Sequence, residues 1–172
     1  LDATLIAGAH VTYLEGYLFD RPKAKEAFRA AAAIAHRAGQ KVALTLSDPF
    51  CVERHRAEFR DLVEGHVDIL FANEAEIRSL WQARDFDEAM RLTRGRCEVA
   101  VLTRSEKGSV VLANNQVHRV AAEPVAKVVE MVDRSEAYVG VFAWRYGYVP
   151  ELTAESKPPA PRGSKPRRPS DD

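Results

Sequence analysis

The sequence has 172 residues, with 25 lysines and arginines balanced by 25 aspartates and glutamates. This length suits one domain with its own core, and the balanced charge provides no basic field for nucleic acid or an anionic membrane, so neither is expected as a partner. The two cysteines fit no disulfide or metal pattern. We expect neither a signal peptide nor a membrane span, because the sequence shows no basic n-region and no long apolar run. We therefore expect a cytoplasmic protein. The start at Leu1 without a methionine indicates that the sequence is a piece of a longer chain.

Strands and helices alternate along most of the chain, as shown by apolar runs of strand length between stretches of helical periodicity. The predicted elements, in chain order, are a strand at 9–14, a helix at 22–37, a strand at 41–46, a helix at 52–64, a strand at 67–72, a helix through 77–81, a helix at 85–93, and strands at 98–103, 109–112 and 116–121. Such alternation forms parallel βαβ units, so the predicted class is α/β with a mainly parallel sheet between helices. Asn114-Asn115 predicts a turn that adds a small antiparallel hairpin.

The stretch 68–76 ends an apolar run at Asn73 and continues with carboxylates. Ligands of open α/β sheets bind just beyond the carboxyl ends of strands, where the next helix begins, so a metal-bound polyphosphate could bind here. Asn73 followed by Glu76 is also an ordinary capping box, which satisfies two backbone donors at a helix start. The local pattern alone favours capping.

Other polar groups have ordinary structural interpretations. Arg54-His55-Arg56 could bind an anion, but the charge-rich helix around it favours a solvated basic face. Asp48 follows a strand and could approach a substrate or metal, although a turn before Pro49 also explains it. The five histidines show no metal-binding spacing. No site is assigned to any of these residues.

The last part of the chain differs in composition from the rest. Residues 157–169 are rich in proline, lysine and arginine and show no apolar periodicity, so we expect residues 151–172 to form a disordered tail after a domain at 1–150. Contact of its basic residues with nucleic acid or an acidic partner is an alternative, but composition favours a solvated tail.

Several segments, taken in order, resemble the PfkB (ribokinase-like) carbohydrate kinases, particularly their adenosine-kinase-like branch. The resemblance covers residues 1–130, with a weaker continuation to about 150, and rests on several motifs in the right order. The matching segments are 11–18, 46–50, 68–76, 101–109 and 120–129.

This resemblance implies a ribokinase-like fold and ATP-dependent phosphoryl transfer to a hydroxymethyl group of a sugar or nucleoside. Asn73 and Glu76 match the family's Asn-x-x-Glu element, which organises Mg²⁺ and its waters, and Mg²⁺ keeps much of its water shell in proteins. The loop from Thr103 through Ser105 to Gly108 matches the segment beside the triphosphate, where hydroxyl and backbone N–H groups suit phosphate oxygens. A plain strand connection that needs Gly108 for its turn explains the loop equally well.

The family's Gly-Ala-Gly-Asp motif is replaced in this chain. Ungapped alignment places Asp133 and Ser135 at the two glycines and Glu136 at the catalytic aspartate. Loss of the anion-hole donors costs a factor of about 10²–10³, and the longer Glu136 side chain shifts its carboxylate by about an ångström. If the chain is active, the resemblance makes Glu136 the base that accepts the proton of the substrate hydroxyl.

Two hypotheses follow from the resemblance. The first is a PfkB-type carbohydrate or adenosine kinase, present as an incomplete chain that uses ATP and Mg²⁺. The second is an inactive remnant that binds nucleotide weakly or acts as an interaction module. The family's acceptor half and lid would precede Leu1. The resemblance implies a nucleotide and a sugar or nucleoside as partners, and an exposed apolar sheet edge would favour a homo-oligomer.

Overall fold

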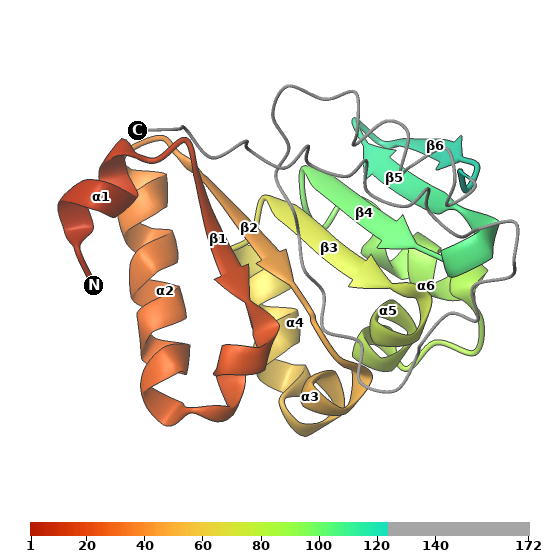
Figure 1. Ribbon diagram of the computed structural model, residues 1–172, viewed down its shortest axis with the longest axis horizontal. Helices are drawn as coiled ribbons and strands as arrows, with labels where there is room; N and C mark the ends of the chain where they lie inside the picture. The colour runs from red at the N-terminus through yellow and green to blue at the C-terminus, as the bar shows by residue number, and fades with distance from the viewer. Residues whose placement is uncertain (124–172) are drawn as a thin grey trace, which may run out of the picture. The chain divides into compact units, whose positions relative to one another are not determined.

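The computed structural model describes residues 1–123, and its strands form a six-stranded sheet within Leu1–Ala122 (Figure 1). The strands lie in chain order across the sheet. They are β1 (Val11–Glu15), β2 (Lys41–Thr45), β3 (Ile69–Asn73), β4 (Val99–Thr103), β5 (Ser109–Ala113) and β6 (Gln116–Val120). Residues 124–172, which include the predicted tail and the predicted domain end at 150, lie outside the described residues.

The sheet is mixed, with a parallel body and an antiparallel end. Strands β1 to β4 pair in parallel, while β5 pairs antiparallel with β4 and with β6. Asn114 and Asn115 join β5 to β6 and both have positive φ, at 50° and 60°, as a two-residue hairpin turn requires. The predicted α/β class, the parallel body and the added hairpin are confirmed.

Helices connect the parallel strands. They are α1 (Ala3–Gly8), α2 (Pro22–Arg37), α3 (Pro49–Arg54), α4 (Arg56–Gly65), α5 (Glu74–Trp81) and α6 (Phe86–Thr93), with short 3₁₀ turns η1 (Gly16–Asp20) and η2 (Ser105–Lys107). Right-handed crossovers between strands that advance in one direction place their helices on one face of the sheet. Figure 1 shows α4 and α6 behind the strands and α2 beside β1. Pro22 starts α2 and Gly39, at φ 71°, follows its end, as predicted.

The predicted single helix at 52–64 is wrong. The structure has two helices, α3 and α4, which meet at His55, where φ is −122° and ψ is 28°. The first helix begins earlier than predicted because Asp48 caps it, accepting hydrogen bonds from the N–H groups of Phe50 and Cys51. The short elements α1 and η1 were not predicted.

The core lies between the sheet and its helices. Alternate residues of the strands point into it, among them Leu44, Leu70 and Leu102, each with no exposed surface, as period-2 alternation requires. Phe19 of η1 stacks on Phe59 of α4 with ring centroids 4.6 Å apart. This packing fixes the ends of the parallel strands relative to the helices that follow them.

The opposite face of the sheet carries apolar side chains that remain exposed. Tyr13 is 51% exposed and Phe71 is 38% exposed, and their ring centroids lie 6.5 Å apart. Parallel strands usually have both faces covered. In the part of the chain that the structure describes, no helix is long and apolar enough to span a bilayer.

Replacing the cap residue Asp48 with alanine should lower the free energy of unfolding by about 1 kcal/mol, since two helix N–H groups lose their acceptor. Urea denaturation followed by circular dichroism measures the change. Asp2→Ala is the matched control, because Asp2 caps α1 with the same two-bond geometry but α1 buries no residue. An equal loss in both variants would contradict the account.

Candidate functional site

Asn73 and Glu76 lie together where β3 ends and α5 begins. The Glu76 N–H donates to Asn73 Oδ1 at 2.9 Å, and the Asn73 N–H donates to Glu76 Oε2 at 2.8 Å. Asn73 Nδ2 also donates to Glu76 Oε1, at 2.5 Å. The predicted capping box is therefore present. It fixes the orientation of the Glu76 side chain, and this residue is only 5% exposed.

The donor chemistry of this pair fits Mg²⁺ held through water. Glu76 supplies carboxylate oxygens and Asn73 an amide oxygen, and oxygen atoms are the ligands that Mg²⁺ prefers. Among residues 1–123, no group of three or more histidine, cysteine, aspartate or glutamate side chains is placed to bind a metal directly. Mg²⁺ commonly keeps several waters and needs few protein ligands, so a water-mediated role is compatible with this geometry.

The neighbouring strand places Thr103 beside Asn73. The two residues are partners in the parallel pairing of β3 and β4, so both lie at the carboxyl edge of the sheet, and the Thr103 side chain is exposed. Ser105, two residues further on, is also exposed and has φ 52°. The structure thus places two of the predicted residues, Asn73 and Thr103, side by side at the ends of β3 and β4, with Ser105 in the loop after β4.

Three backbone N–H groups of the loop are used within the loop itself. Arg104 N donates to Gly108 O at 2.8 Å, Lys107 N to Arg104 O at 3.0 Å and Gly108 N to Ser105 O at 3.0 Å. These amides make the turn and are therefore not available to a ligand without rearrangement. The exposed hydroxyl groups of Thr103 and Ser105 are the better candidates for phosphate contacts.

An ion pair that the sequence reasoning missed links the same two strand ends. Arg104 Nε donates to Glu74 Oε2 at 3.0 Å, and the hydrogen bond from Arg104 holds the pKa of the Glu74 carboxyl below its usual value. Each residue directly follows one of two adjacent strands. Opposite charges at the first position beyond neighbouring parallel strands are the signal that could have revealed the pair.

The carboxyl ends of β1 and β2 add further polar groups to this edge. The Ser47 hydroxyl donates to Glu15, and Ser47 has φ 68°. Burial, followed by the charge of Glu15, raises the pKa of Tyr13, while burial and the charge of Asp48 raise the pKa of Tyr17. Both phenols therefore remain protonated donors at neutral pH.

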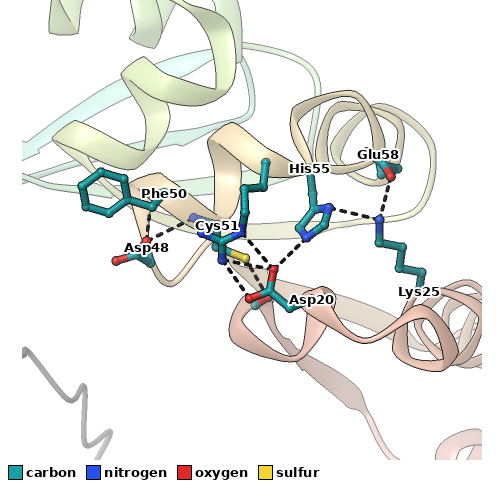
Figure 2. Close-up of polar contacts among 9 residues, drawn as sticks. Asp20, Lys25, Asp48, Phe50, Cys51, His55 and Glu58 are labelled. Atoms are coloured by element: carbon teal, nitrogen blue, oxygen red, sulfur yellow. Dashed lines mark hydrogen bonds and ion pairs between the residues drawn. The ribbon is translucent and has the colours of Figure 1, made fainter.

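The basic segment at 54–56 is engaged in contacts with other elements. Arg54 forms a forked ion pair with Asp20, at 2.8 Å for the shortest contact. His55 points toward the same carboxylate (Figure 2), with its Nε2 atom 2.8 Å from Asp20 Oδ1. Lys25 Nζ lies 3.0 Å from His55 Nδ1. Arg56 Nε donates to the carbonyl of Ser79. These contacts join η1 and α2 to the junction of α3 and α4, and α4 to α5. The Arg54 side chain remains 53% exposed, as a solvated basic face predicts, while His55 and Arg56 are only partly exposed.

The two cysteines should be unreactive at neutral pH. Burial raises the pKa of Cys51 to about 11 and that of Cys97 to about 12, and the thiolate is the reactive form. Mass spectrometry after brief treatment of the folded chain with iodoacetamide at pH 7.5 should therefore show little alkylation, with full alkylation in urea. Rapid labelling of the folded chain would contradict this expectation.

The profile of the pfkB family of carbohydrate kinases matches residues 2–132. The chain belongs to the PfkB family of carbohydrate kinases. The predicted base Glu136 and the altered segment 130–136 lie outside the described residues, so their roles remain predictions.

Solved structures of PfkB proteins agree with this assignment. Adenosine kinase from Sinorhizobium meliloti and a probable sugar kinase from Rhizobium etli CFN 42 are each 47% identical to the chain, with a TM-score of 0.70 over 73% of it. A putative ribokinase II from E. coli in complex with ATP and Mg²⁺ shares the fold at 16% identity and a TM-score of 0.63. The chain spans 38% of the length of the first two. No curated protein matches it.

Proposed function

We propose that this chain is the nucleotide-binding part of a PfkB-type kinase and binds ATP with Mg²⁺ at the carboxyl edge of its sheet. The observation that carries the proposal is the register pairing of Asn73 with Thr103, which places the Asn73–Glu76 pair beside an exposed hydroxyl. The family matched by the chain phosphorylates carbohydrates, and two similar structures are of an adenosine kinase and a probable sugar kinase. The proposed reaction is transfer of the γ-phosphoryl group to a hydroxymethyl group of a sugar or nucleoside.

Each described residue of the site has a distinct proposed task. Asn73 and Glu76 orient the waters of the metal, and their mutual hydrogen bonds keep both side chains in place without the ligand. The hydroxyl groups of Thr103 and Ser105 donate to phosphate oxygens. Gly108 closes the loop between them and β5. Bound Mg²⁺ would supply charge neutralisation on the polyphosphate.

The acceptor side of the reaction depends on residues outside 1–123. Glu136 is proposed to accept the proton of the attacking hydroxyl, in the role of a general base. Asp133 and Ser135 replace the glycines that would expose backbone donors to the transferred group. This replacement favours a second candidate, in which the chain binds nucleotide but transfers phosphate very slowly or not at all.

Assays with purified chain distinguish the two candidates. Radiolabelled ATP measures phosphorylation of adenosine or of a panel of sugars. Product formation by the wild type that is lost in Glu136→Gln would establish the kinase. A rise in melting temperature with Mg·ATP and no product would establish nucleotide binding without turnover, because a ligand that binds the folded state stabilises it. Neither turnover nor a shift in melting temperature would contradict both.

A further inference from the structure

The ion pair between Glu74 and Arg104 joins two segments of the proposed nucleotide site. Asn73 and Thr103 are partners in the sheet, and Glu74 and Arg104 are the residues that follow them. Arg104 Nε and Glu74 Oε2 lie 3.0 Å apart. The pair therefore ties the first residue of α5 to the loop after β4.

The surroundings of Arg104 restrict its position further. Its guanidinium lies over the ring of Phe86, 3.9 Å from the centroid, and its side chain is only 20% exposed, against 29% for Glu74. Its backbone N–H donates to Gly108 O, and its carbonyl accepts from Lys107 N. One residue thus contacts α5, α6 and the far end of its own loop.

We propose that Arg104 is a positioning residue that presets the nucleotide loop for phosphate, an inference that rests on the proposed function. Through Glu74 and Phe86 it holds residues 103–108 against the start of α5, so that the hydroxyl groups of Thr103 and Ser105 are oriented before ATP arrives. Preorganisation of this kind reduces the ordering cost of binding.

The pair also has an electrostatic task. Glu74 is in the first turn of α5, next to Asn73, and an unpaired carboxylate there would repel the phosphates of ATP. Arg104 Nε lies 3.0 Å from Glu74 Oε2, so the two opposite charges are paired. The positive side chain therefore neutralises a negative charge at the edge where the polyphosphate is proposed to bind.

The first test needs no nucleotide. Amide hydrogen exchange of Lys107 and Gly108 should accelerate about fivefold in Arg104→Met, because the loop opens locally, and should stay near the wild-type rate in Arg104→Lys, which keeps a charge for Glu74. Arg84→Met is the matched control, since Arg84 Nε also lies 3.0 Å from a carboxylate, that of Glu88, but outside the loop. Unchanged exchange in Arg104→Met would overturn the proposal.

The second test measures Mg·ATP binding by titration calorimetry of the full chain. Arg104→Met should raise the Kd about tenfold, a coupling of the size expected for contacting residues, and the double variant Arg104→Met with Glu74→Gln should recover part of this loss because the repulsive charge is gone. If the pair has only a structural role, the double variant should show no recovery. A Kd for Mg·ATP in the double variant equal to or higher than that of Arg104→Met would therefore overturn the positioning role.

Failure of the proposed function has a different signature. In that case the wild-type chain does not bind Mg·ATP. The proposed function and the positioning role for nucleotide are then both overturned, even if Arg104→Met accelerates amide exchange. If the wild type binds Mg·ATP and Arg104→Met changes neither exchange nor Kd, only the role of Arg104 is overturned.

Discussion

Replacing Gly108 with alanine should lower the free energy of unfolding by about 3 kcal/mol, from backbone strain and a steric clash together. Gly108 has φ 80° and ψ −141°, a region that is essentially restricted to glycine. A Cβ atom added there would lie 2.0 Å from the carbonyl oxygen of Val120 and 2.8 Å from the backbone nitrogen of Ala122. Because both are backbone atoms, relief requires the loop and the end of β6 to separate.

Urea denaturation followed by circular dichroism measures the effect of Gly108→Ala, and Gly65→Ala is its control. Gly65 ends α4, and a Cβ atom there meets no atom within 4 Å. The control should change the unfolding free energy by less than about 1 kcal/mol. The strain argument fails if the two variants unfold at the same urea concentration.

Replacing Glu76 with alanine should cost about 2–3 kcal/mol of stability, since the N–H groups of Asn73 lose a charged, buried acceptor. The same change should abolish the dependence of ATP binding on Mg²⁺, because Glu76 is the proposed contact of the metal waters. Thermal melts of the variant with ATP, in the presence and absence of Mg²⁺, measure both effects in one experiment.

A cap at a distance from the site provides the comparison for Glu76→Ala. Asp85 caps α6 and accepts from the N–H of Glu88 at 2.8 Å, so Asp85→Ala should lose about 1 kcal/mol and keep the Mg²⁺ dependence. Loss of stability without loss of the Mg²⁺ effect in Glu76→Ala would leave the capping box with a structural role only.

Local patterns predicted the parallel body well, because the signals lie close together in the sequence. The apolar run before Asn73 predicts the end of a strand, and the spacing from Asn73 to Glu76 predicts a capped helix. The hydrogen bonds of the capping box confirm the second prediction. Paired asparagines at 114 and 115 likewise specify their turn without help from the rest of the chain.

The missed features depend on contacts between distant residues. Helix α3 ends next to His55, and the His55 side chain contacts Asp20 and Lys25. These two residues lie 30 or more positions earlier in the sequence. The ion pair of Glu74 and Arg104 likewise becomes visible only once β3 and β4 are known to be neighbours. The sequence suggested both hydroxyl and backbone N–H groups of the loop as phosphate donors. The hydrogen bonds that engage the N–H groups of Arg104, Lys107 and Gly108 within the loop follow only from the folded turn.

Titration calorimetry of the full chain with ATP tests the central claim most directly, with and without Mg²⁺ and in parallel for the wild type and Glu76→Ala. The account predicts saturable binding by the wild type that strengthens with Mg²⁺, and loss of that strengthening in the variant. Absence of ATP binding by the folded wild-type chain, or an identical Mg²⁺ effect in Glu76→Ala, would contradict it.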